Sequence, residues 1–167
     1  LAGQKEPQPR WKRCITATEQ AMGEAIGQLY VKERFAGNSK ELALDMIHGI
    51  ADAFAASLPA LTWMDETTRQ AALVKKGTLA WKIGYPEEWR DYSKLSHFAN
   101  AVAARGFEAS RLLAQVGKPV DRKEWGMNAQ TVNASYNPLQ NAFTYPAGIL
   151  QPPFFHKDFP VAMNLGA

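Results

Sequence analysis

Residues 131–145 read TVNASYNPLQNAFTY, and this stretch decides the fold class. β-Branched and aromatic residues at 131–136 and 141–145 favour strands, and the NPLQ sequence at 137–140 is a strong turn signal. We therefore expect a β-hairpin. If its first strand lies at a sheet edge, its unpaired N–H and C=O groups can bind an extended peptide, and the Asn133 amide adds two donors and an acceptor. The alternative is a strand that is merely paired or covered.

Upstream of the hairpin, four segments carry the periodicity of amphipathic helices. In the first, the apolar series from Trp11 to Leu29 recurs every three or four positions, which predicts one buried stripe. Asn38 is placed to cap the second helix, in a capping-box-like pattern with Glu41, and Asp65 is placed to cap the third. The predicted helices span about residues 10–35, 38–57, 66–79 and 93–115.

The rest of the chain adds little regular structure. Residues 80–86 alternate in polarity and end in Gly-Tyr-Pro, which indicates a short strand or an extended connection. The fold class predicted is mainly α with a small β part (α+β), a helical body of about four helices followed by a β-hairpin. We expect an extended lead-in at 1–9, the helical body at 10–118, and the hairpin with a proline-rich segment at 119–167.

Composition indicates one soluble globular domain. The chain has 167 residues, of which 46% are hydrophobic and 21% charged, enough apolar side chains for a core. Its formal charge of +3 is scattered along the sequence. Because phosphate recognition needs clustered cations, we expect no nucleic-acid partner. No apolar run approaches the roughly 20 residues that cross a bilayer, so we expect no membrane span in this chain.

The three histidines do not form a recognisable metal motif. His48, His97 and His156 are far apart in sequence, and none belongs to a His-Glu-x-x-His pattern, which places two imidazoles on one helical face. We therefore expect His48 and His97 to face solvent or to be partly hydrogen-bonded, and we expect no metal ligand in this chain.

Other residues with reactive or unusual side chains have structural interpretations. Cys14 lies in the first predicted helix among apolar neighbours, which favours burial over a nucleophilic role. Gly23 and Gly27 are four residues apart and predict a close helix crossing rather than a nucleotide site. The acidic pair at 87–88 indicates a solvated loop.

Two stretches carry a family resemblance. VNASY at 132–136 and YPAGILQPPFF at 145–155 closely resemble the neprilysin and endothelin-converting-enzyme metallopeptidases. The resemblance runs from about Pro9 to Ala167 and is strongest with the bacterial oligopeptidase branch. Further segments resemble the same family in the same order: residues 10–14, 27–31, 61–69, 82–86 and 125–127.

The resemblance implies part of a zinc-dependent endopeptidase that hydrolyses oligopeptides. In this family a pattern like that of residues 163–167 leads into a helix with the His-Glu-x-x-His motif, so we expect this chain to stop just before it. The zinc ligands and the glutamate that activates water would then lie outside the chain. We expect no catalytic residue here and an inactive isolated chain. Asn133 and Ala134 match the family's Asn-Ala pair on the edge strand, where substrate backbone is held antiparallel.

Further expectations follow from the same resemblance. Ser135 stands where the family usually has an aromatic residue, and Cys14 resembles a cysteine that often pairs with one near the far C-terminus. The implied partners are an oligopeptide substrate and the remaining C-terminal part of the same enzyme. The implied location is extracytoplasmic, periplasmic or secreted, in a bacterium. The alternative function is a non-catalytic peptide- or protein-binding helical module, and the sequence downstream of Ala167 separates the two.

Overall fold

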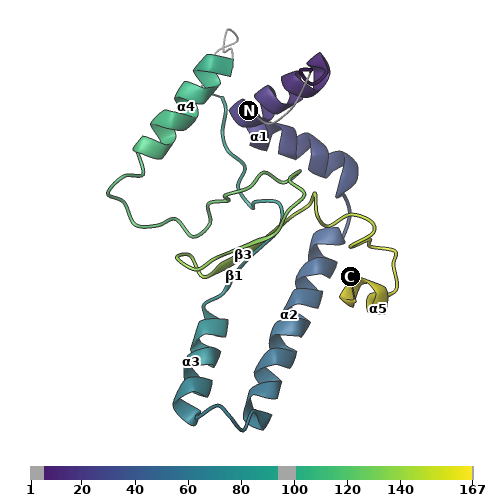
Figure 1. Ribbon diagram of the computed structural model, residues 1–167, viewed down its shortest axis with the longest axis vertical. Helices are drawn as coiled ribbons and strands as arrows, with labels where there is room; N and C mark the ends of the chain where they lie inside the picture. The colour runs from purple at the N-terminus through teal and green to yellow at the C-terminus, as the bar shows by residue number, and fades with distance from the viewer. Residues whose placement is uncertain (1–5, 94–100, 167) are drawn as a thin grey trace.

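A computed structural model describes residues 6–93 and 101–166 of the chain. Its small sheet lies between two helical groups, with α1 and α4 on one side and α2 and α3 on the other (Figure 1). In chain order the elements are α1 (Arg10–Arg34), α2 (Ser39–Ser57), the 3-10 turn η1 (Leu58–Ala60), α3 (Glu66–Gly77), β1 (Ala80–Gly84), α4 (Ala101–Leu113), β2 (Ser135–Asn137), β3 (Ala142–Pro146) and α5 (Val161–Leu165).

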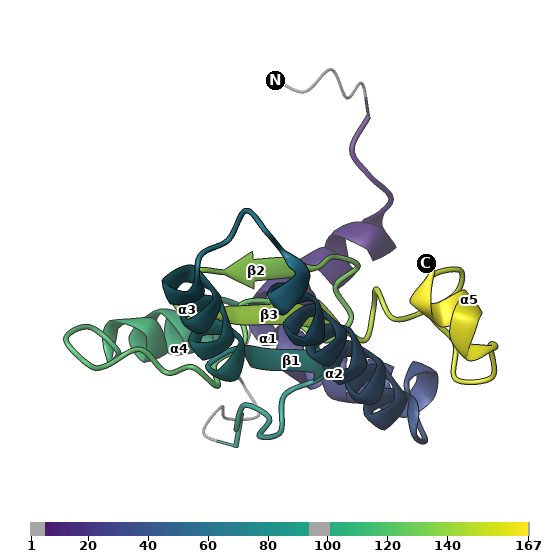
Figure 2. The ribbon, with the colours of Figure 1, turned by 90° about the horizontal axis from the view of Figure 1, so that it is seen from below.

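The sheet has three strands in the order β1-β3-β2, side by side in Figure 2. β2 and β3 pair antiparallel, with Tyr136 opposite Phe143, so the predicted hairpin is confirmed. β1 pairs parallel with β3, with Trp81 opposite Phe143, which sequence patterning did not predict. The fold class is confirmed as mainly α with a small β part. The first hairpin strand is shorter than predicted, because pairing begins only at Ser135.

The core lies where α1 ends, beside the start of α2 and the sheet. Phe35, Ala43, Ile83, Ala147 and Phe155 are buried together there. Gly84 ends β1 in the left-handed region at a φ of +74°, and a Cβ at this position would lie 2.6 Å from Cε1 of Phe35. Glycine is therefore required both by the backbone conformation and by the ring packed against it.

The apolar stripe predicted for α1 is wrong. Trp11 is 62% exposed and Leu29 is 68% exposed, whereas the buried residues of this helix are Ala21, Gly23, Glu24 and Gly27. The helix is also interrupted at Met22, where φ is −142° and ψ is 43°. Small residues face inward because neighbouring backbone and side chains approach α1 closely, and a large apolar side chain would block that approach.

The two predicted helix caps have different outcomes. The Asp65 carboxylate accepts a hydrogen bond of 2.7 Å from the Thr68 backbone N–H, as predicted. Asn38 makes no side-chain capping bond, so that prediction is wrong. Asp65 has the extended backbone that aims a side chain at the first turn, whereas Asn38, at a φ of −92° and a ψ of 18°, does not.

Two sequence predictions are only partly covered by the structure. The fourth helix spans Ala101–Leu113, while residues 94–100, including His97, lie outside the described part of the chain. The segment boundaries at residues 10 and 119 stay a prediction, and the sheet joins the two segments because β1 pairs with β3. Within the described residues, no helix has the length and apolarity that crossing a membrane requires.

Candidate functional site

The hairpin presents an open strand edge. β2 pairs with β3 on one side and with no other strand in the part of the chain that the structure describes. All three residues of β2 are exposed, and so are Asn133 and Ala134 immediately before it. The Asn133 Oδ1 accepts a hydrogen bond of 2.8 Å from the Ala134 backbone N–H. An exposed amide thus precedes a strand whose outer backbone groups can pair with another chain.

Local hydrogen bonds fix the hairpin turn. The Asn137 Oδ1 accepts from the Leu139 backbone N–H at 3.0 Å and from the Gln140 backbone N–H at 3.3 Å, as a turn asparagine does. Asn141 follows in the left-handed region with a φ of 45°. Its Nδ2 donates to the Lys75 carbonyl at 3.0 Å, which ties the hairpin to the end of α3.

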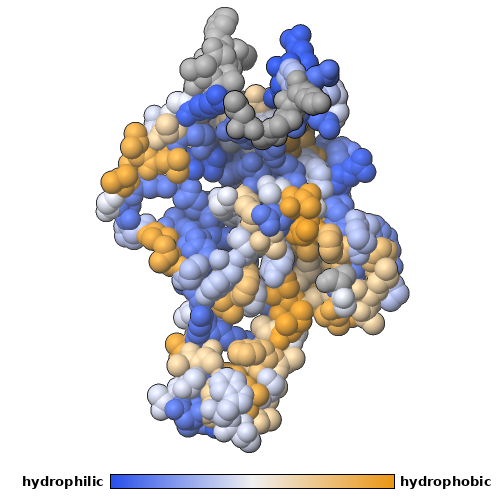
Figure 3. Space-filling view, in the orientation of Figure 1, coloured by the Kyte–Doolittle hydropathy of each residue, from blue (hydrophilic) through white to orange (hydrophobic). Residues whose placement is uncertain are grey.

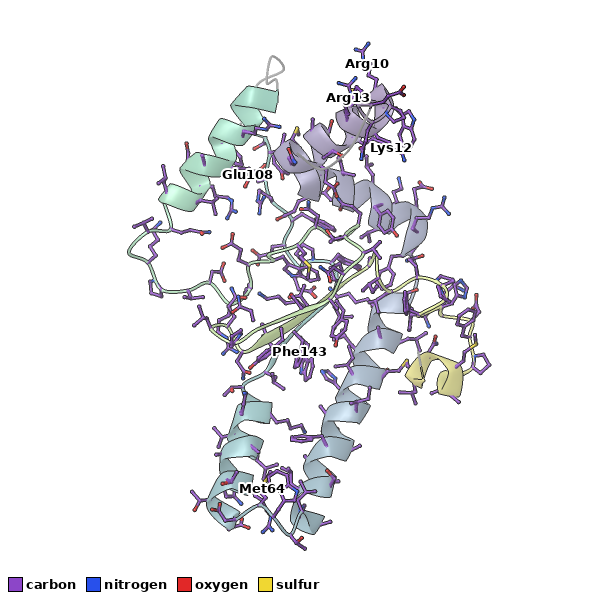
Figure 4. All side chains as sticks on the ribbon, viewed as in Figure 1. Arg10, Lys12, Arg13, Met64, Glu108 and Phe143 are labelled. Carbon is purple, nitrogen blue, oxygen red and sulfur yellow. The ribbon has the colours of Figure 1, made fainter. Side chains whose placement is uncertain are left out.

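One face of the sheet forms the floor of an apolar groove. Phe143 stacks on Trp81 at 5.5 Å between ring centroids and lies 4.7 Å from the Tyr136 ring. Figure 4 shows Phe143 on the side of the sheet that faces α2 and α3. These two helices complete the groove, of about 570 Å³, with Ile50 and Phe54 of α2 among its lining residues.

The opposite side of the molecule carries charged side chains in a chain of ion pairs. Arg90 contacts Glu24 of α1 at 2.7 Å and Glu108 of α4 at 2.9 Å. Arg111 of α4 joins Glu108 to Glu124. Four of these residues, all but Glu108, line a second, polar hollow of about 470 Å³. Each of the three carboxylates in this series of ion pairs has an arginine partner, and the three share two arginines.

The described histidines lie on separate elements. His48 is exposed on α2, as expected for a solvent-facing histidine, and its ring makes a T-shaped contact with Trp81. His156 lies in the loop before α5, where its Nδ1 accepts from the Asp158 backbone N–H at 3.3 Å. Across residues 6–93 and 101–166, no group of three or more His, Cys, Asp or Glu side chains is placed to hold a metal ion. These residues do not fit a zinc site.

Two further predictions about α1 are corrected. Cys14 is exposed, not buried, because the N-terminal half of α1 projects away from the core. Gly23 and Gly27 do permit a close approach, but not by a helix. A Cβ at Gly23 would collide with the Asn128 side chain, and one at Gly27 would lie 3.0 Å from Oε1 of Gln130. The loop ahead of the hairpin, rather than another helix, packs against this face.

Two parts of the chain match one known family. Residues 1–86 and residues 133–167 each match a model of peptidase family M13. This chain belongs to peptidase family M13. The M13 chain is 37% identical to an endothelin-converting enzyme homolog of Locusta migratoria, over all of this chain and 25% of that protein. It is 35% identical to neprilysin-3 of Drosophila melanogaster, over all of this chain and 23% of that protein.

A solved structure has the same fold. The zinc metalloprotease Zmp1 of Mycobacterium tuberculosis in its open state superposes with a TM-score of 0.87 at 41% identity, over 97% of this M13 chain and 26% of that one. The chain therefore spans about a quarter of the length of the relatives it matches. The similarity of this chain to the endothelin-converting enzyme and neprilysin relatives agrees with the resemblance that its sequence motifs indicated.

Sequence reasoning missed two residues that hold this M13 chain together. Arg90 follows the acidic pair at 87–88, for which a solvated loop was expected, yet it pairs with two carboxylates. Gln130 carried no recognisable signal, although its side chain binds α1. Neither could have been found from spacing, because their partners lie between 18 and 111 positions away along the chain.

Proposed function

We propose that this chain is part of a zinc-dependent endopeptidase for oligopeptides, in which it supplies the substrate-binding edge strand and a wall of the cleft. One observation carries the proposal: exposed Asn133 and Ala134 run directly into β2, whose outer edge has no strand partner among the described residues. The M13 membership supports it, since the relatives named above are similar over the whole chain.

The task of this chain is to position a peptide. An extended substrate that pairs with β2 adds one more strand, and the repeating backbone hydrogen bonds fix its carbonyl groups without selecting side chains. The Asn133 Oδ1 binds the Ala134 N–H, whereas its Nδ2 has no hydrogen-bond partner in the described structure. That amide nitrogen is available to donate to a substrate carbonyl.

Zinc, in this proposal, is bound by polypeptide outside this chain, because the described residues offer no suitable ligand set. When bound, the metal supplies the Lewis-acid chemistry of a metallopeptidase. The remaining C-terminal part of the same enzyme is therefore a required partner, and the isolated chain is inactive. Metal analysis of purified residues 1–167 should find no stoichiometric zinc, and peptide assays should find no hydrolysis. Either zinc bound at one equivalent or turnover by this piece would contradict the proposal.

The decisive test is the substitution Asn133→Ala in the full-length enzyme. We expect this substitution to lower kcat/KM for an oligopeptide. The decrease should correspond to a loss of about 1–3 kcal/mol in transition-state binding, the size of a lost directed hydrogen bond. Asn38→Ala is the matched control, because Asn38 is exposed and its side chain makes no capping bond. An unchanged kcat/KM would remove Asn133 from the site. Peptide binding without hydrolysis by the unaltered protein would favour the non-catalytic module instead.

We further propose an extracytoplasmic location, periplasmic or secreted. Cys14 is exposed and free, and it is the single cysteine of the chain, so a disulfide would have to reach a residue outside it. Such a bond persists only in an oxidising compartment. Peptide mass mapping of the native enzyme without reduction should find Cys14 joined to a distant cysteine. Recovery of Cys14 as a free thiol from protein fractionated with the cytoplasm would contradict both points.

A further inference from the structure

The segment ahead of the edge strand is held between two other parts of the chain. On one side it meets α1 near the break at Met22. On the other it meets Gly148, just beyond β3. Ala129, at the centre of this segment, is 1% exposed. Asn133 follows only a few residues later, so whatever holds residues 128–131 also limits where Asn133 can lie.

The contact with α1 is made chiefly by the Gln130 side chain. Its Nε2 donates to the Gly23 carbonyl and to the Glu19 carboxylate, each at 3.1 Å. Gly27 leaves room for the same amide, since a Cβ there would lie 3.0 Å from Oε1 of Gln130. Gly23 likewise leaves room for Asn128. The two glycines make a shallow seat on α1 that an alanine would fill.

The contact on the other side is made by backbone. Gly148 donates its N–H to the Ala129 carbonyl at 2.8 Å. A Cβ on Gly148 would collide with the Gln130 carbonyl and lie 2.6 Å from the Thr131 carbonyl oxygen. The chain therefore passes between α1 and Gly148 with no space to shift sideways.

Two anchors then bracket the exposed pair. Upstream is the clamped segment that ends at Thr131, and downstream is Ser135, paired with Thr144 of β3. Only three residues, 132–134, lie between the anchors, and an extended chain covers about 3.3 Å per residue. A shift of Gln130 is therefore passed on to Asn133, which has no buried contact of its own to resist it.

We infer that Gln130 is a positioning residue for substrate binding, acting through Asn133. The inference rests on the proposed function and extends it to a half-buried clasp formed by Gln130, Glu19 and Gly23. Gln130 does not touch the substrate. It holds the strand entrance so that the Asn133 amide and the edge of β2 present their donors and acceptors to a peptide in one fixed arrangement, which lowers the ordering cost of binding.

The test is a double-mutant cycle in the full-length peptidase that carries this sequence. Gln130→Met keeps the length of the side chain and removes both hydrogen bonds to α1. We expect kcat/KM for an oligopeptide to fall about tenfold, the effect of losing one or two hydrogen bonds. In the Asn133→Ala background the same change should have almost no further effect, since the residue through which it acts is gone. Gln28→Met is the matched control: Gln28 is an exposed glutamine of α1, and this substitution should leave kcat/KM unchanged.

The outcomes separate this inference from the proposed function. Additive losses in the double variant, or an unchanged kcat/KM in Gln130→Met, would overturn the positioning role of Gln130. Neither result would affect the proposed substrate-binding role of Asn133. A harmless Asn133→Ala would instead remove the proposed function. If Gln130→Met does not fold, Gln130→Glu places two carboxylates together at Glu19 and leaves no donor for the Gly23 carbonyl. Adding Glu19→Gln restores a donor at the Glu19 contact alone. Partial recovery of kcat/KM in that pair supports the clasp, and no recovery in a folded pair opposes it.

Discussion

At the scale of the residue, Lys82 is the least expected side chain in the sheet. It lies in the middle of β1 with 6% of its surface exposed. Its Nζ donates to the Glu124 carbonyl at 2.5 Å and to Oε1 of Gln140 at 2.8 Å, and neither acceptor is charged. Burial lowers the pKa of Lys82, and the charges of Asp121 and Glu124 oppose that shift only in part.

The lowered pKa of Lys82 predicts a stability change at alkaline pH. As pH rises, the folded protein releases this proton before the unfolded chain does, so stability from Lys82 grows between the folded pKa and the ordinary lysine value. It is lost again as pH falls through the folded pKa. In denaturant titrations, the unfolding free energy of the unaltered protein should therefore rise relative to that of Lys82→Met as pH increases across this window. Lys118→Met, at an exposed lysine, should show no such trend; a parallel trend would refute the assignment.

At the scale of the element, the start of a helix depends on backbone geometry as much as on the capping residue. Asp65 and Asn38 are both good N-cap residues, yet only Asp65 binds its first turn. The Thr68 backbone N–H lowers the pKa of the Asp65 carboxyl by hydrogen-bonding to its charged form. The same bond leaves α3 with one fewer unsatisfied donor at its N-terminus.

We predict that Asp65→Ala weakens α3 and Asp65→Asn does so much less, because asparagine also accepts from the first turn. Hydrogen exchange at the Thr68 amide and the thermal midpoint would report the difference. Since the folded pKa of Asp65 is lowered, its contribution is present above the unfolded carboxyl pKa and disappears as pH falls through the folded value. Asn38→Ala should change neither the hydrogen exchange nor the thermal midpoint. A decrease in the thermal midpoint as large as that of Asp65→Ala would contradict this account.

At the scale of the whole molecule, ion pairs form one link between α4 and the rest. The lower end of α4 exposes apolar side chains in Figure 3, with Leu113 72% exposed. Arg90 instead links Glu108 of α4 to Glu24 of α1, which is 8% exposed. These pairs are largely shielded from water, so breaking one leaves a carboxylate poorly solvated.

Arg90→Met should therefore cost about 2–3 kcal/mol of unfolding free energy, somewhat less than the loss of one partner in a fully buried pair. Arg34→Met, at an exposed arginine of α1, should cost no more than about 0.5 kcal/mol. Equilibrium denaturation of both variants decides the point. Equal effects would mean that Arg90 contributes only as a surface charge.

Local patterns were enough for most of the longer elements of this chain and for its family, but not for the short helix α5. The NPLQ turn, the Asp65 cap and the helical periodicities act over a few residues, so the sequence predicted the hairpin, the start of α3 and the α+β class. The YPAGILQPPFF stretch at 145–155 likewise pointed to the metallopeptidase family. Asn133 came from the edge-strand argument and from the resemblance, Ala134 from the resemblance alone, and their role stays a prediction.

Tertiary structure decided what touches what. The parallel pairing of β1 with β3, the inward face of α1 and the Gln130 clasp all join residues distant in sequence. Periodicity placed Trp11 inside because it measures apolarity around a helix, whereas burial on α1 depends on how closely a loop can approach Gly23 and Gly27. Such contacts are set by the shape of the packed chain, and no local pattern encodes the distance between segments that meet only on folding.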